Sequence, residues 1–170
     1  TWEEARDFCT LCLPYVNVLF GIEPYHIWKN EEDHSAGDVK DGIPFQPDFE
    51  QQEKVFRAFA DRYPNIKCIA RHVRFAHSCS ENSLMAYLWY DGKTYESQKL
   101  RFHILDRVGG GDAFVSGIIY ALMNEYKPQD IADFGVAASA VKHTIHGDGN
   151  ITDDISLIEH IMQMNFDIKR

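Results

Sequence analysis

Three consecutive glycines stand directly before an acidic residue and a long apolar run in "DRVGGGDAFVSGIIYALM". The residues before the glycines predict the end of a strand, and those after them predict a helix over 111–124. The first turn of a helix leaves backbone N–H groups without partners, and together with the helix dipole these groups attract an anion. Glycine removes the side chains that would keep the oxygens of an anion away. The pattern therefore predicts a phosphate site at Gly109, Gly110 and Gly111.

The carboxylate of Asp112 falls in the first turn of the same predicted helix. The helix dipole keeps it ionised, and its negative charge prevents it from binding the phosphate itself. It can accept a proton from a hydroxyl group aimed at the phosphate, which is general-base catalysis of phosphoryl transfer to an alcohol. From spacing alone, a glycine-rich turn in which Asp112 merely caps the helix explains the pattern equally well. A Walker A loop and a G-x-S-x-G elbow are absent, and Phe114 stands where a Rossmann fingerprint needs glycine.

Hydrophobic periodicity along the rest of the chain predicts strands followed by helices, which indicates an α/β layered domain. The dipeptide Asp91-Gly92 is suited to the positive φ angles of a hairpin turn. The predicted elements are helices at 2–13, 48–63, 111–124, 129–145 and 153–164, strands at 15–21 and 65–73, a hairpin over 84–102, and an extended loop or insertion at 22–47.

The net charge of −9 limits the classes of partner. Its long-range field repels phosphate, which argues against nonspecific binding to nucleic acid or to anionic membranes. The chain has no apolar run of 18 residues, the length that a membrane-spanning helix needs. A small phosphate ligand is still allowed, because backbone dipoles can hold it locally. We therefore expect small-molecule partners, with no nucleic acid and no membrane.

The four cysteines bear on the cellular compartment. Cys9 and Cys12 form a C-x-x-C pair, but a zinc site needs a second pair of ligands, which Cys68 and Cys79 do not supply at suitable spacing. We expect buried, free thiols in a reducing cytosol and hence a cytoplasmic protein. The chain also opens within a predicted helix and without a starting Met, so we expect a fragment.

The stretch "DRVGGGDAFVSGIIYAL" resembles the C-terminal signature of the ribokinase-like (PfkB) carbohydrate kinases, which reads D-T-x-G-A-G-D-A-F with a small residue and a glycine shortly after it. The matching positions are Asp106, Gly109, Gly111, Asp112, Ala113, Phe114, Ser116 and Gly117. The following "FGVAASAVKHTIHGD" is similar to the 2-keto-3-deoxygluconate kinases in particular. The resemblance runs from about Tyr15 to Asp148 and covers roughly the C-terminal half of such an enzyme.

The resemblance implies a ribokinase-like three-layer α/β/α sandwich, of which residues 1–170 would be the C-terminal, ATP-binding portion with a β-hairpin. It implies ATP-dependent phosphorylation of a sugar or sugar-acid hydroxyl, with 2-keto-3-deoxygluconate as the expected substrate and ATP and Mg²⁺ as cofactors. The sugar-binding N-terminal half and its lid are absent, so we expect this fragment alone to be inactive. A homo-oligomer is compatible with the resemblance.

The resemblance also assigns roles to single residues. Asp112 matches the catalytic base that contacts the sugar hydroxyl, and the three glycines match the anion hole for the transferred phosphoryl group. Asp148 matches a carboxylate that binds the keto-deoxy acid. Arg71 matches a basic residue near the ATP phosphates, and the helix 129–145 matches a wall of the nucleotide pocket.

Two positions depart from the family pattern. Ile22 stands where the asparagine of the N-x-x-E motif that organises Mg²⁺ is expected, and only Glu23 keeps a carboxylate nearby, so the metal ligands stay unassigned. Arg107 replaces the usual Thr or Pro, and we expect it to point to solvent. Two alternatives stay open: a related kinase for fructose, ribose or a nucleoside, and a noncatalytic nucleotide-binding module.

Overall fold

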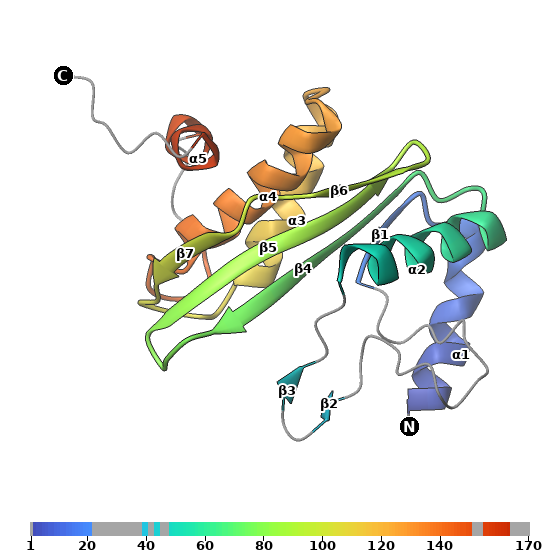
Figure 1. Ribbon diagram of the computed structural model, residues 1–170, viewed down its shortest axis with the longest axis horizontal. Coiled ribbons are helices and arrows are strands. Elements are labelled where there is room, and N and C mark those ends of the chain that lie inside the picture. The colour runs from blue at the N-terminus through green and yellow to red at the C-terminus, as the bar shows by residue number, and fades with distance from the viewer. Residues whose placement is uncertain (1, 22–38, 41–42, 45–47, 151–154, 164–170) are drawn as a thin grey trace. The chain divides into compact units, whose positions relative to one another are not determined.

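The structure is a computed structural model that describes residues 2–21, 39–40, 43–44, 48–150 and 155–163 (Figure 1). It is mixed α/β with one open five-stranded sheet of order β1-β4-β5-β6, in which β7 also pairs with β5. The chain divides into two compact units. The first holds residues 1–71 and 89–94, and the second holds residues 72–88 and 95–170.

The first unit begins with α1 (Trp2–Cys12), as predicted, and Pro14 lies in the 3-10 turn η1 (Leu13–Tyr15) that follows it. Strand β1 (Val18–Phe20) is shorter than the predicted 15–21, because η1 extends to Tyr15 and the chain leaves it through Val16 and Asn17. It runs parallel to the start of β4 (Cys68–Ala76), with Val18 opposite Cys68.

Helix α2 (Phe49–Arg62) confirms the predicted amphipathic helix. The carboxylate of Asp48 caps it by accepting from the amide of Gln51 at 2.8 Å, and Phe56 and Phe59 are buried. After the helix, the side-chain amide of Asn65 donates to the carbonyls of Leu13 and Val16 at 2.8 and 2.7 Å. These bonds hold η1 beside the end of α2.

Within the predicted loop 22–47, two short strands, β2 (Val39–Lys40) and β3 (Ile43–Pro44), form an antiparallel pair. The other residues of this loop, including Ile22 and Glu23, lie outside the described residues.

The predicted hairpin is present, with β5 (Glu81–Tyr90) and β6 (Lys93–Glu96) joined by Asp91 and Gly92 at φ angles of 48° and 80°. Its second strand is interrupted, however, and the chain resumes as β7 (Leu100–His103), which is antiparallel to the other end of β5. The interruption occurs at buried Ser97, whose Oγ accepts from the amide of Ala86 at 2.8 Å.

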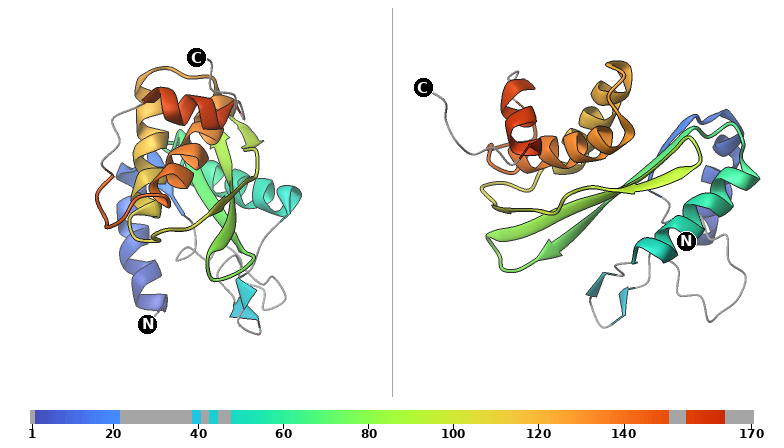
Figure 2. Two further views of the ribbon diagram at one scale, coloured as in Figure 1. Left: turned by 90° about the vertical axis from the view of Figure 1, so that its left-hand side faces the viewer. Right: turned by 45° about the horizontal axis from the view of Figure 1, so that its top comes forward.

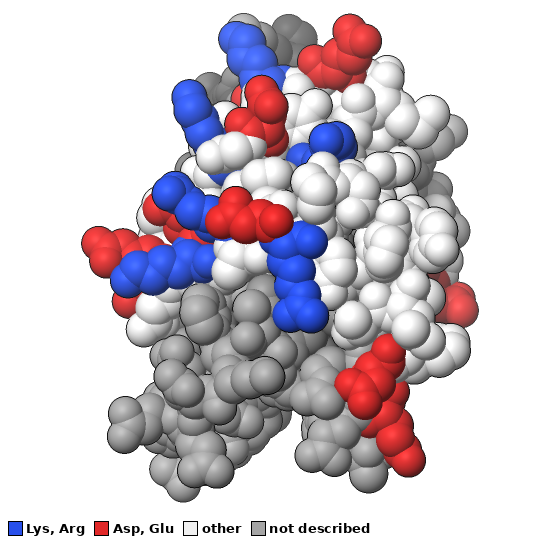
Figure 3. Space-filling view, turned by 90° about the vertical axis from the view of Figure 1, so that its right-hand side faces the viewer, with Lys and Arg blue, Asp and Glu red and all other residues white. Residues whose placement is uncertain are grey.

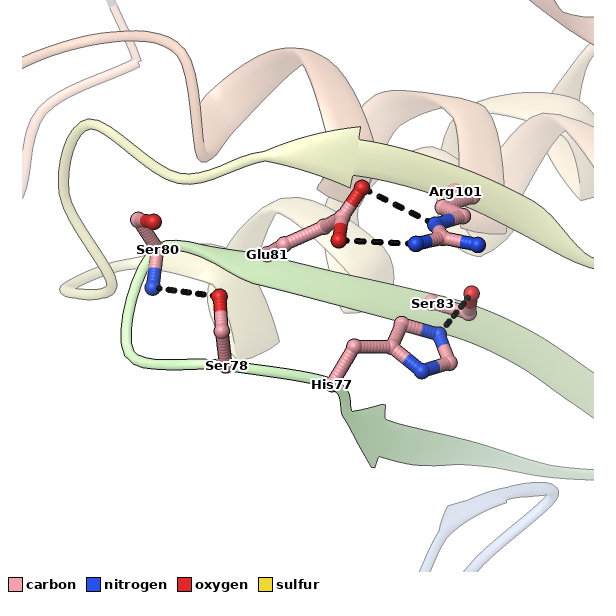
Figure 4. Close-up of polar contacts among 6 residues, drawn as sticks. All are labelled: His77, Ser78, Ser80, Glu81, Ser83 and Arg101. Carbon is pink, nitrogen blue, oxygen red and sulfur yellow. Dashed lines mark hydrogen bonds and ion pairs between the residues drawn. The ribbon is translucent and has the colours of Figure 1, made fainter.

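Polar side chains cluster near the β4–β5 turn, and one pair among them helps to fix the register of β7 against β5 (Figure 4). The carboxylate of Glu81 accepts two bonds from the guanidinium of Arg101, at 2.9 and 2.8 Å. In the turn itself, the His77 ring lies 2.7 Å from the hydroxyl of Ser83 on β5. The Glu81–Arg101 pair is largely exposed, so it specifies pairing more than it adds stability.

Three helices form a layer on one face of the sheet strands in the second unit (Figure 2). They are α3 (Gly110–Met123), α4 (Pro128–Lys142) and α5 (Ile155–Met162). A Cβ atom at Gly117 would lie 2.9 Å from the Cβ of Ala138 and 3.1 Å from the Cα of Gly135. These small residues therefore let α3 and α4 pack backbone to backbone. The second helical layer of the expected three-layer α/β/α sandwich stays a prediction.

The prediction of buried thiols is correct only for Cys68. All four thiols are free, but Cys12 and Cys79 are exposed and Cys9 is half-buried. On α1 the neighbouring Phe8 and Leu11 are exposed as well, so this part of the helix leaves its apolar side chains uncovered.

Lys and Arg side chains lie among Asp and Glu side chains on the face drawn in Figure 3, so this face carries charges of both signs. No helix in the described part of the chain has the length and apolar character needed to cross a membrane.

Candidate active site

The glycine turn lies in the second unit, between the end of β7 and the start of α3. The amides of Leu105 and Asp106 donate to the carbonyl of His143 at 2.8 and 3.2 Å. These bonds join the segment before the glycines to the C-terminal end of α4. The turn is therefore held by a helix that lies about 30 residues further along the chain.

The three glycines meet different surroundings. Gly109 caps α3 in the left-handed conformation at φ 78°, and a Cβ there would overlap the carbonyl oxygen of Asp148. A Cβ on Gly110 would overlap the ring of His143, whereas at Gly111 nothing lies within 4 Å. Two of the glycines are thus required by close packing, and only Gly111 leaves the open space that the sequence argument assigned to all three.

The first turn of α3 offers backbone donors. No side chain caps this helix, and its first described backbone bond runs from the amide of Ala113 to the carbonyl of Gly109 at 2.9 Å. Within the described ranges, the amides of Gly110, Gly111 and Asp112 have no acceptor. Uncapped N–H groups at a helix start form an anion site.

Both predicted acids lie in the second unit and are exposed. Asp112 sits in the first turn of α3, in line with the expected position beside the amides. Asp148 follows α4, and its backbone carbonyl lies over Gly109. The structure thus places the backbone of Asp148 against the turn that leads into Asp112.

Arg71 lies in the first unit, where it is buried at the end of that unit's part of β4. Its Nη1 donates to the side-chain oxygen of Gln52 on α2 at 2.7 Å. Its proposed contact with ATP phosphates stays a prediction, as does the nucleotide wall formed by 129–145.

Four residues that the sequence argument left without a role support the turn: Asp106, Ser139, Lys142 and His143. The carboxylate of Asp106 accepts from the amides of Val108 at 3.1 Å and Gly147 at 2.8 Å, and these bonds lower its pKa. The hydroxyl of Ser139 donates to the carbonyl of Gly110 at 2.8 Å. The available signal was the presence of polar residues inside the otherwise small and apolar "VAASAVKH".

The ring of His143 is buried against Gly110 and contacts the ring of Phe102 at a centroid distance of 5.0 Å. Its Nδ1 lies 2.7 Å from the carbonyl oxygen of Ser139. A carbonyl only accepts, so Nδ1 carries the proton and donates. Burial lowers the pKa of His143, which keeps the ring neutral.

This lowered pKa predicts a loss of stability in acid. Below about pH 6.5 the imidazole of His143 binds a proton in the unfolded chain, whereas burial disfavours the same protonation in the folded chain. The contribution of His143 to the free energy of unfolding is therefore complete above that pH and is lost as the pH falls towards the lower pKa of the folded state. We expect wild type to lose up to about 1.4 kcal/mol per pH unit relative to His143→Gln. Urea unfolding between about pH 7.5 and 5.5 tests this, and parallel pH profiles for the two proteins would contradict it.

Metal ligands are not gathered within the described residues, where no group of three or more His, Cys, Asp and Glu side chains could hold an ion. Glu23, the carboxylate nearest the family's metal motif, lies outside the described part. Arg107 is exposed as expected, but its guanidinium also donates to the carbonyl of Cys79 at 2.9 Å.

In three comparisons with known proteins, this chain is similar to carbohydrate kinases. Residues 86–155, which include the glycine turn and all of α4, match the pfkB family carbohydrate kinases. Over 71 residues the chain is 31% identical to a 5-dehydro-2-deoxygluconokinase of Clostridium botulinum. That match covers 42% of this chain and 20% of the Clostridium protein.

The fold is similar to part of the ribokinase-like fold. A 2-dehydro-3-deoxygluconokinase from Thermotoga maritima superposes with a TM-score of 0.79 and 28% identity, over 96% of this chain and 47% of that one. A putative ribokinase II from E. coli in complex with ATP and Mg²⁺ matches in fold alone, with a TM-score of 0.62 and 16% identity, over 95% of this chain and 44% of that one. The chain thus spans about half the length of these solved kinases and about a fifth of the curated relative.

Proposed function

We propose that this chain provides the phosphate-binding half of an ATP-dependent sugar-acid kinase, because residues 86–155 match the pfkB family carbohydrate kinases. In this proposal residues 1–170 are the C-terminal, ATP-binding part, and a sugar-binding half completes the enzyme. The observation that carries the proposal is the start of α3, where three amides that have no acceptor among the described residues lie beside the exposed carboxylate of Asp112.

The amides of Gly110, Gly111 and Asp112 hold the transferred phosphoryl group as it gains charge. The carboxylate of Asp112 accepts the proton of the sugar hydroxyl while that oxygen attacks phosphorus and ADP leaves. Gly109 takes part through its left-handed conformation, which turns the chain into α3 while the missing side chain leaves room for the carbonyl of Asp148. Arg71 is assigned to the ATP phosphates on the family pattern alone.

The substrate we propose is a keto-deoxy gluconate. The names of the Clostridium and Thermotoga relatives both specify a dehydro-deoxygluconate, which is a sugar acid with one keto and one deoxy position. We favour 2-keto-3-deoxygluconate, because the Thermotoga kinase matches 96% of this chain and the Clostridium protein matches 42%.

Kinases of this family use ATP and Mg²⁺, and we propose both as cofactors. Mg²⁺ supplies charge neutralisation at the phosphates when it is bound. The described residues of this chain do not form a ligand set for it, so the roles derived above rest on the glycine amides and Asp112 alone.

The test is a substrate screen with the protein expressed from its complete reading frame, with ATP, Mg²⁺ and each candidate acceptor. We expect phosphorylation of 2-keto-3-deoxygluconate to exceed that of fructose, ribose and a nucleoside. A preference for one of those three would replace the substrate and leave the chemistry unchanged. Binding of ATP without any transfer would favour the noncatalytic nucleotide-binding module.

Asp148 provides a prediction about sugar binding. Asp148→Ala should raise the KM for the sugar acid by about 10–100-fold, because a charged acceptor of the sugar hydroxyl is lost. The KM for ATP should change much less, since the phosphate amides belong to the start of α3. Steady-state kinetics with each substrate varied in turn makes the comparison, and equal increases in both constants would remove Asp148 from sugar binding.

A further inference from the structure

Lys142 is the last residue of α4, and its side chain is fully buried, at 0% exposure. Its ammonium group donates to the carbonyl oxygens of Ile145 at 3.1 Å and Gly147 at 2.6 Å. Among the residues that the structure describes, it makes no ion pair with a carboxylate. A buried ammonium is costly unless fixed dipoles compensate it, and here the carbonyls just beyond the end of α4 provide that compensation.

The peptide groups of Gly147 are held from both sides. Its amide donates to the carboxylate of Asp106 at 2.8 Å, while its carbonyl accepts from Lys142. Gly147 adopts a φ of 81°, which few other residues take up readily. An anion and a cation therefore fix one residue of the turn after α4 in a single orientation.

This arrangement bears directly on the glycine turn. Asp148 follows Gly147, and its carbonyl lies so close to Gly109 that any side chain at Gly109 would overlap it. The Cε of Lys142 would lie 3.1 Å from a Cβ at Gly109. The lysine side chain thus packs against Gly109, next to the amides that are proposed to bind the phosphate.

We propose that the ammonium of Lys142 is a built-in cation of the phosphate-binding turn, which fixes Gly147 and thereby holds Gly109 and Asp148 in place. Lys142 is a positioning residue, because its side chain is fully buried and its ammonium group is bonded to the carbonyls of Ile145 and Gly147. The effect on turnover rests on the proposed function, whereas the effect on the fold does not.

The proposal makes a specific claim about ions. In wild type the carbonyls of Ile145 and Gly147 are already occupied by an ammonium group, so added monovalent cations have nothing to stabilise there. In Lys142→Met the apolar stem is kept and the charge is removed, which leaves two carbonyl dipoles converging on a space of ammonium size. A small cation can bind these oxygens, and tetramethylammonium cannot, because it is too large and has no N–H donor.

The experiment compares urea unfolding of the chain in ammonium chloride and in tetramethylammonium chloride at equal concentration. We expect the wild-type midpoint to be the same in both salts. The midpoint of Lys142→Met should fall by roughly 1 M urea in tetramethylammonium and recover by at least half in ammonium. Lys127→Met, which removes an exposed lysine at the start of α4, is the matched control and should respond like wild type.

Equal midpoints of Lys142→Met in the two salts would overturn the proposal, as would a wild-type midpoint that rises in ammonium. If Lys142→Met does not fold in either salt, Lys142→Ala is unfolded and refolded with n-propylammonium, which replaces the missing carbons and charge. Failure of that ion to restore folding also overturns it.

Turnover provides the second readout. In the protein expressed from its complete reading frame, Lys142→Met should lose on the order of 10²-fold in kcat in tetramethylammonium, because the amides and Asp148 are displaced. Ammonium should restore kcat, while the wild-type value stays the same in both salts. If wild type transfers no phosphate, the proposed function fails and the unfolding result still decides the role of Lys142.

Discussion

Replacing Asp112 by asparagine should lower kcat for sugar-acid phosphorylation by about 10²–10⁴-fold, the usual contribution of a general base. The variant keeps the size and hydrogen-bonding shape of the side chain and removes only its ability to take the proton. Because Asp112 is exposed at the start of α3, its replacement leaves no buried group unpaired. Steady-state kinetics of the protein expressed from its complete reading frame measures the loss.

Asp130→Asn is the matched control for this prediction. Asp130 occupies the first turn of α4, so its replacement removes the same favourable interaction with a helix dipole, about 0.3–1 kcal/mol of stability. Both variants should therefore lose similar stability, and only Asp112→Asn should lose turnover. Unchanged turnover in Asp112→Asn would remove Asp112 from the role of base.

Gly109→Ala should lower the free energy of unfolding by about 2–5 kcal/mol, the largest stability effect that we expect in the glycine turn. Two costs add at this position. The φ of 78° is unfavourable for any residue with a Cβ, and that Cβ would overlap the backbone carbonyl of Asp148, which cannot rotate away as a side chain would. Chemical unfolding of the purified variant measures the change.

Gly111→Ala is the contrasting variant. Gly111 lies inside α3 with nothing within 4 Å of a Cβ, so alanine should stabilise the helix by up to about 1 kcal/mol. Opposite signs at Gly109 and Gly111 would show that the left-handed backbone and the close packing against Asp148 select glycine at 109, whereas neither acts at 111. Similar effects at both positions would contradict the tight packing against Asp148.

Features that depend on neighbouring residues were predicted from the sequence. The Asp91-Gly92 turn adopts the positive φ angles that its residue types favour, and α3 begins within one residue of its predicted start. Helix α2 begins where Asp48 caps it. In each case the chemistry that sets the boundary lies within about four residues of it, so a local pattern is sufficient.

Boundaries set by distant residues were predicted less well. Helix α4 ends at Lys142 and not at 145: the amides of Thr144 and Ile145 donate to carbonyls three residues back, and the carbonyl of His143 accepts from Leu105 and Asp106. The second strand of the hairpin is interrupted because the Ser97 hydroxyl bonds the backbone of β5. Strand β4 continues to Ala76, beyond the predicted residue 73, as part of a sheet that only the fold assembles.

The amino-acid sequence by itself determined the glycine turn, the helix that follows it and the acid in the first turn of that helix, since all of these arise within one short segment. Only the tertiary structure decided what supports the turn: Asp148 over Gly109, His143 against Gly110, and the buried ammonium of Lys142 behind both. The physical reason is distance along the chain. These contacts join residues more than 30 positions apart, and no local pattern encodes which polar side chain the folded backbone will bury there.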